Sequence, residues 1–329
     1  MNFLINIDIK KPFRSISYRD KIMLTGSCFT EHIGQALKDL KFSVYQNPHG
    51  ILFDPASVCR SLHDLVQERE YDERDLFMLN ETWNSWHHHS RFSNTDASEA
   101  LLHINKTLKE ARAFLAKADW LVITLGSSFS YRLTDLVAGH LGEPVANCHR
   151  APAQWFQKHM LSTQETVHLM EQCCREMLAF NPDLNFIFTV SPVRHIRDGV
   201  VENNRSKGRL LEAVHQLNEM FPQSYYFPAY ELVIDVLRDY RFYDIDLVHP
   251  NYAATDYVLE QFTNNCLEEE SRTLSEDVRK IVIARKHRAF QPSTNAHRQF
   301  LTAHYEKAKL LQEKYPYLDF SEELDYFAP

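Results

Sequence analysis

Short apolar segments alternate with amphipathic segments along most of the chain. The apolar segments are typical of buried strands and lie at residues 21–25, 42–45, 120–125, 185–190 and 225–227. Between them, apolar residues recur at helical spacing, which predicts helices over residues 30–40, 55–67, 96–116, 163–180, 206–220, 230–239 and 251–266. Near-continuous apolar strands that alternate with helices indicate a parallel sheet covered on both faces. We therefore expect an α/β protein, a three-layer α/β/α sandwich with a flavodoxin-like parallel sheet of about five strands.

The character of the sequence changes near residue 267. Residues 275–288 and 295–315 are charged and helix-prone, and no apolar run typical of a strand separates them. We expect one α/β domain over residues 1–266 and a helical C-terminal extension over residues 267–329 that packs on it.

Composition and charge narrow the classes of function. The 329 residues carry a formal net charge of -8, so no basic excess exists to offset phosphates, and we expect no nucleic-acid or membrane partner. The chain contains neither GxGxxG nor GxxxxGK[ST], which disfavours a nucleotide-binding enzyme. The start of the chain lacks a secretory pattern, and the 6 cysteines follow no disulfide or metal spacing. We expect a reduced, cytoplasmic protein.

The first candidate for chemistry is Ser27. It follows the apolar run Ile22-Met23-Leu24 and precedes a predicted helix, so its hydroxyl lies at the carboxyl edge of the predicted sheet, beside the free N–H groups of a helix. These groups support a developing anion, as nucleophilic catalysis requires. Two alternatives stay open: Ser27 as a plain helix cap, and its neighbour Cys28 as the nucleophile.

The second candidate is a histidine just before the last predicted α/β helix. His249 lies in a loop, and Asp246 lies three residues before it. At this spacing the carboxylate can bind a ring nitrogen, fix the tautomer and stabilise the imidazolium. The alternative is a surface histidine beside a helix-flanking aspartate. Taken together, the two stretches predict a triad in which Ser27 is the nucleophile, His249 the base and Asp246 the orienting group.

These residues also carry a family resemblance. Ser27 after the first strand, with Asp246-Leu247-Val248-His249-Pro250-Asn251 before the last helix, resembles the SGNH (GDSL-type) hydrolase superfamily. Gly26-Ser27-Cys28-Phe29, with Thr30 in place of alanine, resembles more closely the GSCFA family, a bacterial group named after this motif. Further strings are similar to the GSCFA pattern, namely Asn47-Pro48-His49-Gly50, Ser191-Pro192-Val193-Arg194-His195 and Asn203-Asn204-Arg205-Ser206-Lys207. The resemblance extends over about residues 20–262.

The resemblance implies an oxyanion hole with three donors. The superfamily uses the backbone N–H of the serine, here Ser27, a glycine after the second strand, which Gly50 matches, and an asparagine after the third strand. Gly126-Ser127-Ser128 stands where Gly-x-Asn is expected, which puts the efficiency and the reaction type in question. Ser128 is one candidate for the third donor, and Asn147 from a later loop is the other.

Further polar residues near predicted strand ends are candidates for substrate binding, namely Asn47, His87, His88, Arg194 and His195. Arg194 suits an anionic substrate group; the alternative is an ion pair that holds the loop. Trp86-His87-His88-His89 is a histidine-rich stretch, but its spacing differs from the usual zinc patterns. We assign no metal site to it; a metal-dependent hydrolase stays as an alternative.

The leading hypothesis is a serine esterase that acts on a small-molecule or carbohydrate ester, for example an O-acetylated sugar, without a cofactor. One rival is an O-acyltransferase with the same triad. Another is a binding protein on a decayed hydrolase scaffold. The substrate and the oligomeric state are not determined by the sequence.

Overall fold

A parallel sheet lies at the centre of the computed structural model, which describes residues 5–137, 139–287 and 289–328. Its five strands have the order β2-β1-β5-β8-β9, and all neighbouring pairs are parallel. The strands are β1 (Lys21–Gly26), β2 (Ser43–Gln46), β5 (Trp120–Leu125), β8 (Asn185–Val190) and β9 (Ser224–Tyr226). The predicted flavodoxin-like sheet is confirmed, because this order places the first strand between the second and the third.

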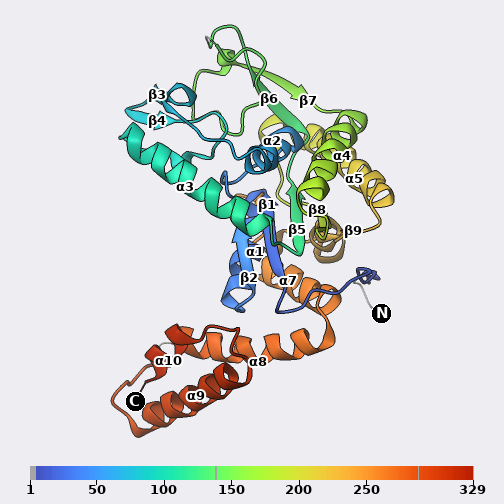
Figure 1. Ribbon diagram of the computed structural model, residues 1–329. Helices are drawn as coiled ribbons and strands as arrows, with labels where there is room; N and C mark the ends of the chain where they lie inside the picture. The colour runs from blue at the N-terminus through green and yellow to red at the C-terminus, as the bar shows by residue number, and fades with distance from the viewer. Residues whose placement is uncertain (1–4, 138, 288, 329) are drawn as a thin grey trace.

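Helices cover both faces of this sheet (Figure 1). Along β1, Ile22 and Leu24 belong to one apolar core and Met23 to another, as expected when successive side chains point to opposite faces. Helices α1 (Cys28–Asp39) and α7 (Tyr252–Cys266) bury their apolar residues in the first core. The second core contains α2 (Pro55–Val66), α3 (Ala97–Leu115), α4 (Thr163–Phe180) and α5 (Val200–Met220). The predicted three-layer α/β/α sandwich is therefore confirmed.

Two antiparallel hairpins lie outside the central sheet and were not predicted. They are β3 (Phe77–Leu79) with β4 (Thr82–Asn84), and β6 (Phe129–Leu133) with β7 (Phe156–Met160). Asn80 and Glu81 join the first pair, and both have positive φ angles of 49° and 63°. This is the geometry of a two-residue hairpin turn that usually contains glycine, so the Asn-Glu pair hides it from the sequence.

Within the α/β domain, two predicted helices differ clearly from the structure. Helix α5 begins at Val200, after Gly199 with φ 88°, and not at residue 206. Residues 230–239 do not form one α-helix: a short α6 (Ala229–Glu231) passes into a π-helical turn, Leu232–Leu237. Short 3₁₀ helices occur at Glu73–Asp75, Ser90–Phe92, Ala153–Trp155, Ile196–Asp198 and Tyr240–Phe242.

Three helices follow α7, namely α8 (Glu269–Lys286), α9 (Asn295–Lys314) and α10 (Ser321–Phe327). Figure 1 shows these three helices below the sheet. Helix α10 was not predicted from the sequence. Glu323 of α10 is fully buried; its Oε2 lies 2.7 Å from Lys41 Nζ and its Oε1 lies 3.3 Å from Arg285 Nε. The pair with Lys41 joins α10 to the segment that precedes β2, and the pair with Arg285 joins α10 to α8. No described helix combines the length and the apolar character that crossing a membrane requires.

Candidate active site

The nucleophile candidate lies at a tight turn between β1 and α1. Gly26 ends β1 with φ 137°, and a Cβ at this position would approach Thr124 O to 2.1 Å, so only glycine fits. Asn47 holds the turn, because the Gly26 N–H donates a hydrogen bond to its Oδ1 at 3.0 Å. The substrate-binding candidate Asn47 thus has a structural contact here. The turn brings Ser27 to the carboxyl end of the central sheet.

The Ser27 side chain is fully buried and its Oγ has no hydrogen-bond partner among the described residues. Ser27 occupies the N-cap position of α1, yet its side chain makes no capping hydrogen bond. Leaving a buried hydroxyl without a partner costs about 1–3 kcal/mol, and native structures rarely do so. The helix-cap interpretation therefore does not account for this serine.

Cys28, the rival nucleophile, is half-buried as the first residue of α1. Burial raises the pKa of its thiol, which outweighs the nearby backbone hydrogen bonds and Lys207. A raised pKa lowers the fraction of thiolate, which is the reactive form of cysteine. The raised pKa of the Cys28 thiol therefore argues against Cys28 as the nucleophile.

Asp246 and His249 form a tight pair in the loop before α7. The ring Nδ1 of His249 donates to Asp246 Oδ2 at 2.6 Å, and Asp246 Oδ1 accepts the N–H groups of Val248 and His249 at 2.9 and 3.0 Å. These hydrogen bonds, led by the one from His249, lower the pKa of Asp246 to about 2. Both side chains are about half exposed. The aspartate is thus arranged to fix the ring of His249.

The residue beside Ser27 is a different histidine. Ser27 Cβ and His195 Nε2 each lie 3.3 Å from the position that a Cβ on Gly126 would occupy. Like Ser27 Oγ, His195 Nε2 is buried and has no hydrogen-bond partner among the described residues. The Arg194 N–H donates to Val248 O at 3.2 Å, which joins the His195 loop to the Asp246–His249 loop. The structure thus brings Ser27, Gly126 and His195 together, with His249 on the adjoining loop.

The candidate oxyanion donors are partly engaged within the protein. The Ser27 N–H donates to Thr124 O at 3.2 Å, and the Gly50 N–H donates to Asn47 O at 2.8 Å. Asn147 Oδ1 accepts the His149 N–H at 2.8 Å, a contact that does not use the amide N–H donors of Asn147. By contrast, Ser128 Oγ is buried and has no partner among the described residues. These positions stay predictions as oxyanion donors.

Sequence reasoning assigned no role to Lys207 on α5. Its side chain is 1% exposed, and its Nζ donates to Gly126 O at 2.5 Å and to Ser191 O at 2.6 Å. Burial lowers the pKa of this ammonium to about 7. Lys207 therefore ties the loops after β5 and β8 together next to Ser27. The only signal in the sequence was its place in the string Asn203-Asn204-Arg205-Ser206-Lys207, quoted for the family resemblance.

The histidine-rich stretch forms part of a buried polar cluster. His88 is 1% exposed; its ring stacks on His49 at 4.5 Å, and its Nδ1 lies 3.0 Å from Ser85 Oγ. His87 is also buried, with its Nε2 3.5 Å from Glu143 Oε2. Among the described residues, no group of three or more His, Cys, Asp or Glu side chains is arranged to hold a metal ion.

Arg194 contacts aromatic rings from the loop that precedes Asp246. Its guanidinium carbon lies 4.3 Å from the centre of the Tyr243 ring and 5.0 Å from that of Tyr240. Its Nη1 also donates to Leu247 O at 3.3 Å. These contacts link Arg194 to the Asp246–His249 loop through aromatic rings and a carbonyl, rather than through the ion pair that the alternative to substrate binding expected.

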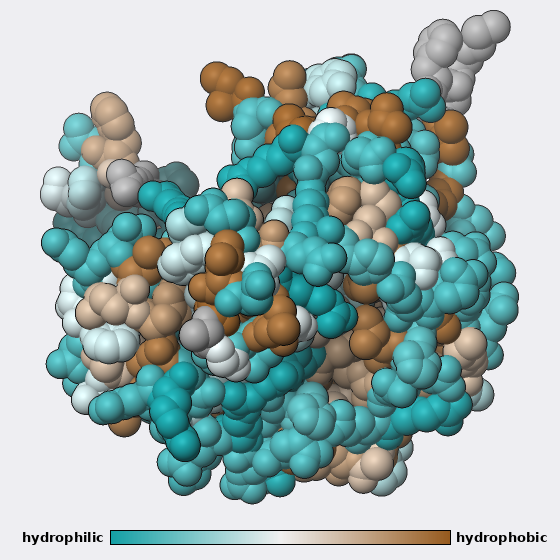
Figure 2. All heavy atoms as spheres, turned by 90° about the horizontal axis from the view of Figure 1, so that it is seen from above, coloured by the Kyte–Doolittle hydropathy of each residue, from teal (hydrophilic) through white to brown (hydrophobic). Residues whose placement is uncertain are grey.

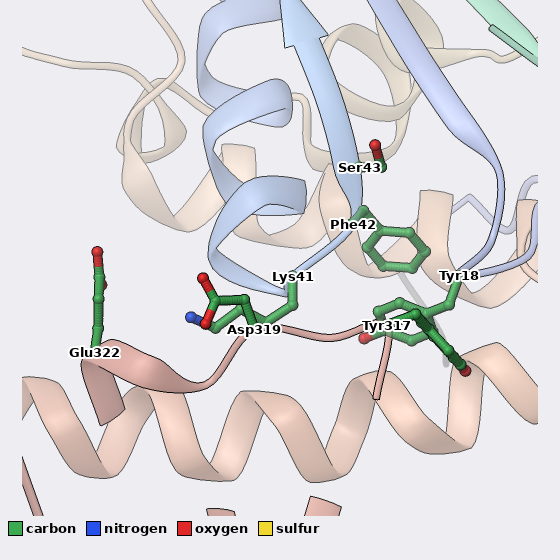
Figure 3. A pocket seen from close by; sticks show the side chains of 7 residues that line it. All are labelled: Tyr18, Lys41, Phe42, Ser43, Tyr317, Asp319 and Glu322. Carbon is green, nitrogen blue, oxygen red and sulfur yellow. The ribbon is translucent and has the colours of Figure 1, made fainter. Parts of the chain in front are cut away.

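Two cavities lie near opposite ends of strand β2. One of about 290 Å³ is lined by Asn47 and Arg91 at the carboxyl end, on the side of Ser27. Another of about 270 Å³ lies at the amino end, between Lys41 and the C-terminal segment (Figure 3). Seen from above, the surface carries hydrophobic residues in separate patches among hydrophilic ones (Figure 2). Only the first cavity lies at the edge of the sheet that carries Ser27.

Two protein-family models match this chain, whereas no curated protein does. The model described as "GSCFA family" matches residues 21–262, and the one described as "GSCFA domain protein, C-terminal domain" matches residues 278–328. No curated protein matches.

Solved structures give weaker matches. One is an acetyl-xylooligosaccharide esterase mutant from Geobacillus Stearmophilus, at 13% identity and TM-score 0.42, over 78% of this chain and 98% of that one. Another is a carbohydrate esterase family 3 protein from Talaromyces cellulolyticus, at 11% identity and TM-score 0.37, over 79% and 99%. At TM-scores this low, neither likeness bears on the chemistry of this chain.

Proposed function

The chain belongs to the GSCFA family, and from that premise we propose that it is a serine esterase acting on a small-molecule or carbohydrate ester, such as an O-acetylated sugar. The observation that carries the proposal is Ser27: a fully buried hydroxyl without a partner, at a turn that only glycine permits at the preceding position. Strain and unpaired polar groups of this kind cluster at functional sites. The Asp246–His249 pair on the adjoining loop supports the assignment of a base.

The proposed reaction proceeds through an acyl-enzyme. Ser27 Oγ attacks the ester carbonyl while its proton passes to His249 Nε2, and the imidazolium then protonates the leaving alcohol. Asp246 holds Nδ1 of the ring and stabilises the imidazolium. Water, deprotonated by His249, then releases the acid and restores Ser27. The protein needs no cofactor for these steps.

The proposed mechanism requires His249 to approach Ser27, since Ser27 Oγ has no hydrogen-bond partner among the described residues. Catalytic hydrogen bonds often tighten only in the substrate complex. Ser27 is also closed to solvent, so the surrounding loops must open for an ester to reach it. We propose that the loop carrying Asp246 and His249 moves in this step.

A fluorophosphonate probe tests the assignment directly. The wild type is expected to become labelled, with the adduct on Ser27 in a peptide map, because the probe reacts with serines that a base activates. Ser27→Ala and His249→Ala are expected to lose labelling while keeping the wild-type circular dichroism spectrum. Cys28→Ala is the matched control and is expected to retain labelling. In the wild type, an adduct found on Cys28 instead of Ser27 would refute Ser27 as the nucleophile.

The missing hydrogen bond to Ser27 Oγ favours one second candidate, a binding protein on a hydrolase scaffold. The same experiment separates the two, because a folded wild type that resists labelling would support the binding protein. If labelling occurs, single-turnover partition of the acyl-enzyme between water and sugar hydroxyls distinguishes an esterase from an O-acyltransferase.

A further inference from the structure

His195 lies next to Ser27 with one ring nitrogen free. Its backbone N–H donates to Asn203 Oδ1 at 2.8 Å, and its ring packs at 78° against Phe53, with ring centres 5.3 Å apart. Two contacts therefore fix the residue, while its Nε2 stays buried and without a partner among the described residues. That nitrogen lies 3.3 Å from the Cβ position on Gly126, as Ser27 Cβ does. His195 Nε2 and Ser27 thus border the same space beside Gly126.

The ring of His195 is held in the neutral form. Burial, followed by the charge of Lys207, lowers its pKa to about 3. His249 and Arg197 act in the same direction, and only Asp198 opposes them. A neutral imidazole carries one N–H and one acceptor nitrogen. At neutral pH, His195 is therefore a fixed donor or a fixed acceptor, according to which nitrogen holds the proton.

The site lacks a clear third oxyanion donor. The predicted backbone donors, Ser27 and Gly50, each donate to a carbonyl within the protein. At the third position, Gly126-Ser127-Ser128 provides no asparagine amide, and the Ser128 N–H donates to Ser206 Oγ at 2.8 Å. Ser128 Oγ and His195 Nε2 both lack a partner among the described residues, and His195 Nε2 lies 3.3 Å from the Cβ position on Gly126.

We propose that His195, with its proton on Nε2, donates the hydrogen bond that stabilises the oxyanion formed when an ester is attacked by Ser27. The inference rests on the proposed esterase function. When the bond from Ser27 Oγ to the carbonyl carbon forms, the C=O π electrons move to oxygen, and the seryl proton passes to His249. His195 keeps its own proton throughout. When the intermediate collapses, the carbonyl re-forms and the leaving alcohol takes the proton from His249.

The charges around the two histidines assign them different roles. His249 has Asp246 on Nδ1 to stabilise an imidazolium, so it suits proton transfer. The strongest charge effect on His195 comes from Lys207, whose Nζ is held by the carbonyls of Gly126 and Ser191. When protonated, Lys207 opposes an imidazolium at His195 and favours a negative charge beside Gly126. Lys207 is accordingly a positioning residue, and His195 is a donor that does not titrate at neutral pH.

The rate constant for fluorophosphonate labelling tests this role, with two substitutions at each histidine. His195→Ala is expected to lower the rate about 10²–10³-fold, the usual effect of removing one oxyanion donor. His195→Gln keeps an N–H donor and is expected to stay within about tenfold of the wild type, equivalent to about 1.4 kcal/mol. His249→Ala and His249→Gln are both expected to abolish labelling, because an amide cannot accept the proton. His159→Ala, at an exposed histidine on β7, is the matched control.

The outcomes separate this inference from the proposed function. If the wild type labels at Ser27 and His195→Ala labels at the same rate, the donor role is wrong and the esterase stands. If His195→Gln is as inactive as His249→Gln, His195 is a base and the inference is overturned. If the wild type does not label, the esterase proposal fails. The ring can still be examined by ¹⁵N NMR: a neutral Nε2–H tautomer at pH 7 is expected, and an Nδ1–H tautomer would overturn the inference.

Discussion

Replacing His88 by phenylalanine is expected to make the protein more resistant to acid. His88 is 1% exposed, and its ring packs between His49 at 4.5 Å and Tyr71 at 4.8 Å. Burial, followed by the charges of His49, His87, His149 and His103, holds its pKa well below the usual value. The folded protein therefore keeps His88 neutral, while the unfolded chain protonates it near pH 6.5.

The sign and size of the effect follow from proton linkage. Below about pH 6.5 the unfolded state binds one proton more than the folded state at this residue, so falling pH favours unfolding by about 1.4 kcal/mol per pH unit. The loss is absent at pH 8 and grows as the pH falls below about 6.5, for as long as His88 stays neutral in the folded protein. A phenylalanine ring keeps the aromatic packing and does not titrate. It forfeits the hydrogen bond to Ser85 Oγ, which is worth about 1 kcal/mol.

Urea unfolding followed by tryptophan fluorescence from pH 8 to pH 4.5 measures this difference. As the pH falls from 8 to 4.5, the stability of His88→Phe relative to the wild type is expected to rise, with a slope of at most about 1.4 kcal/mol per pH unit below about pH 6.5. The control is His168→Phe at an exposed histidine on α4, for which the difference from the wild type should not change with pH. A constant gap between His88→Phe and the wild type at every pH would refute the reasoning.

Two further predictions concern the turn before Ser27 and the C-terminal helices. Gly26→Ala should destabilise the protein by about 3 kcal/mol or more, because the added Cβ meets Thr124 O at 2.1 Å. The control is Gly208→Ala, in open space on α5, which should stabilise the protein by about 1 kcal/mol. Equal effects of the two substitutions in thermal unfolding would contradict this prediction. Glu323→Gln should cost about 3 kcal/mol by leaving Lys41 without its buried partner and should expose the C-terminal helices to limited proteolysis. Unchanged protease resistance would show that this ion pair does not hold them.

The central sheet could be predicted because its strands are buried on both faces. Residues 120–125 and 185–190 are nearly continuous apolar runs, and the structure gives β5 and β8 the same bounds. A strand buried on both faces is apolar at most positions, which leaves a strong signal in the sequence. Parallel pairing then places the ends of these strands on one edge, so Ser27 and the loop after β8 were expected on the same side.

The environment of Ser27 could not be predicted, because it depends on which loop residue turns inward. Nothing in the string Ser191-Pro192-Val193-Arg194-His195 distinguishes the inward His195 from the neighbouring Arg194, which contacts aromatic rings. Lys207 and Glu323 were missed for a related reason. A charged residue in a helix is usually exposed, and the sequence does not reveal the carbonyls or the lysine that pair with these two in the interior.

The buried polar atoms of this protein that lack partners are concentrated where the sheet ends. Among the described residues, Ser27 Oγ, Ser128 Oγ, His49 Nδ1 and His195 Nε2 are all without a hydrogen bond, and all follow one of the strands β1, β2, β5 and β8. Each such atom costs about 1–3 kcal/mol, so selection for stability alone would replace them with apolar groups. Their presence at one edge, beside a turn that only glycine allows, indicates that this edge is maintained for binding or chemistry. The stacked rings of His49 and His88 lie next to this edge, after the turn that carries Asn47.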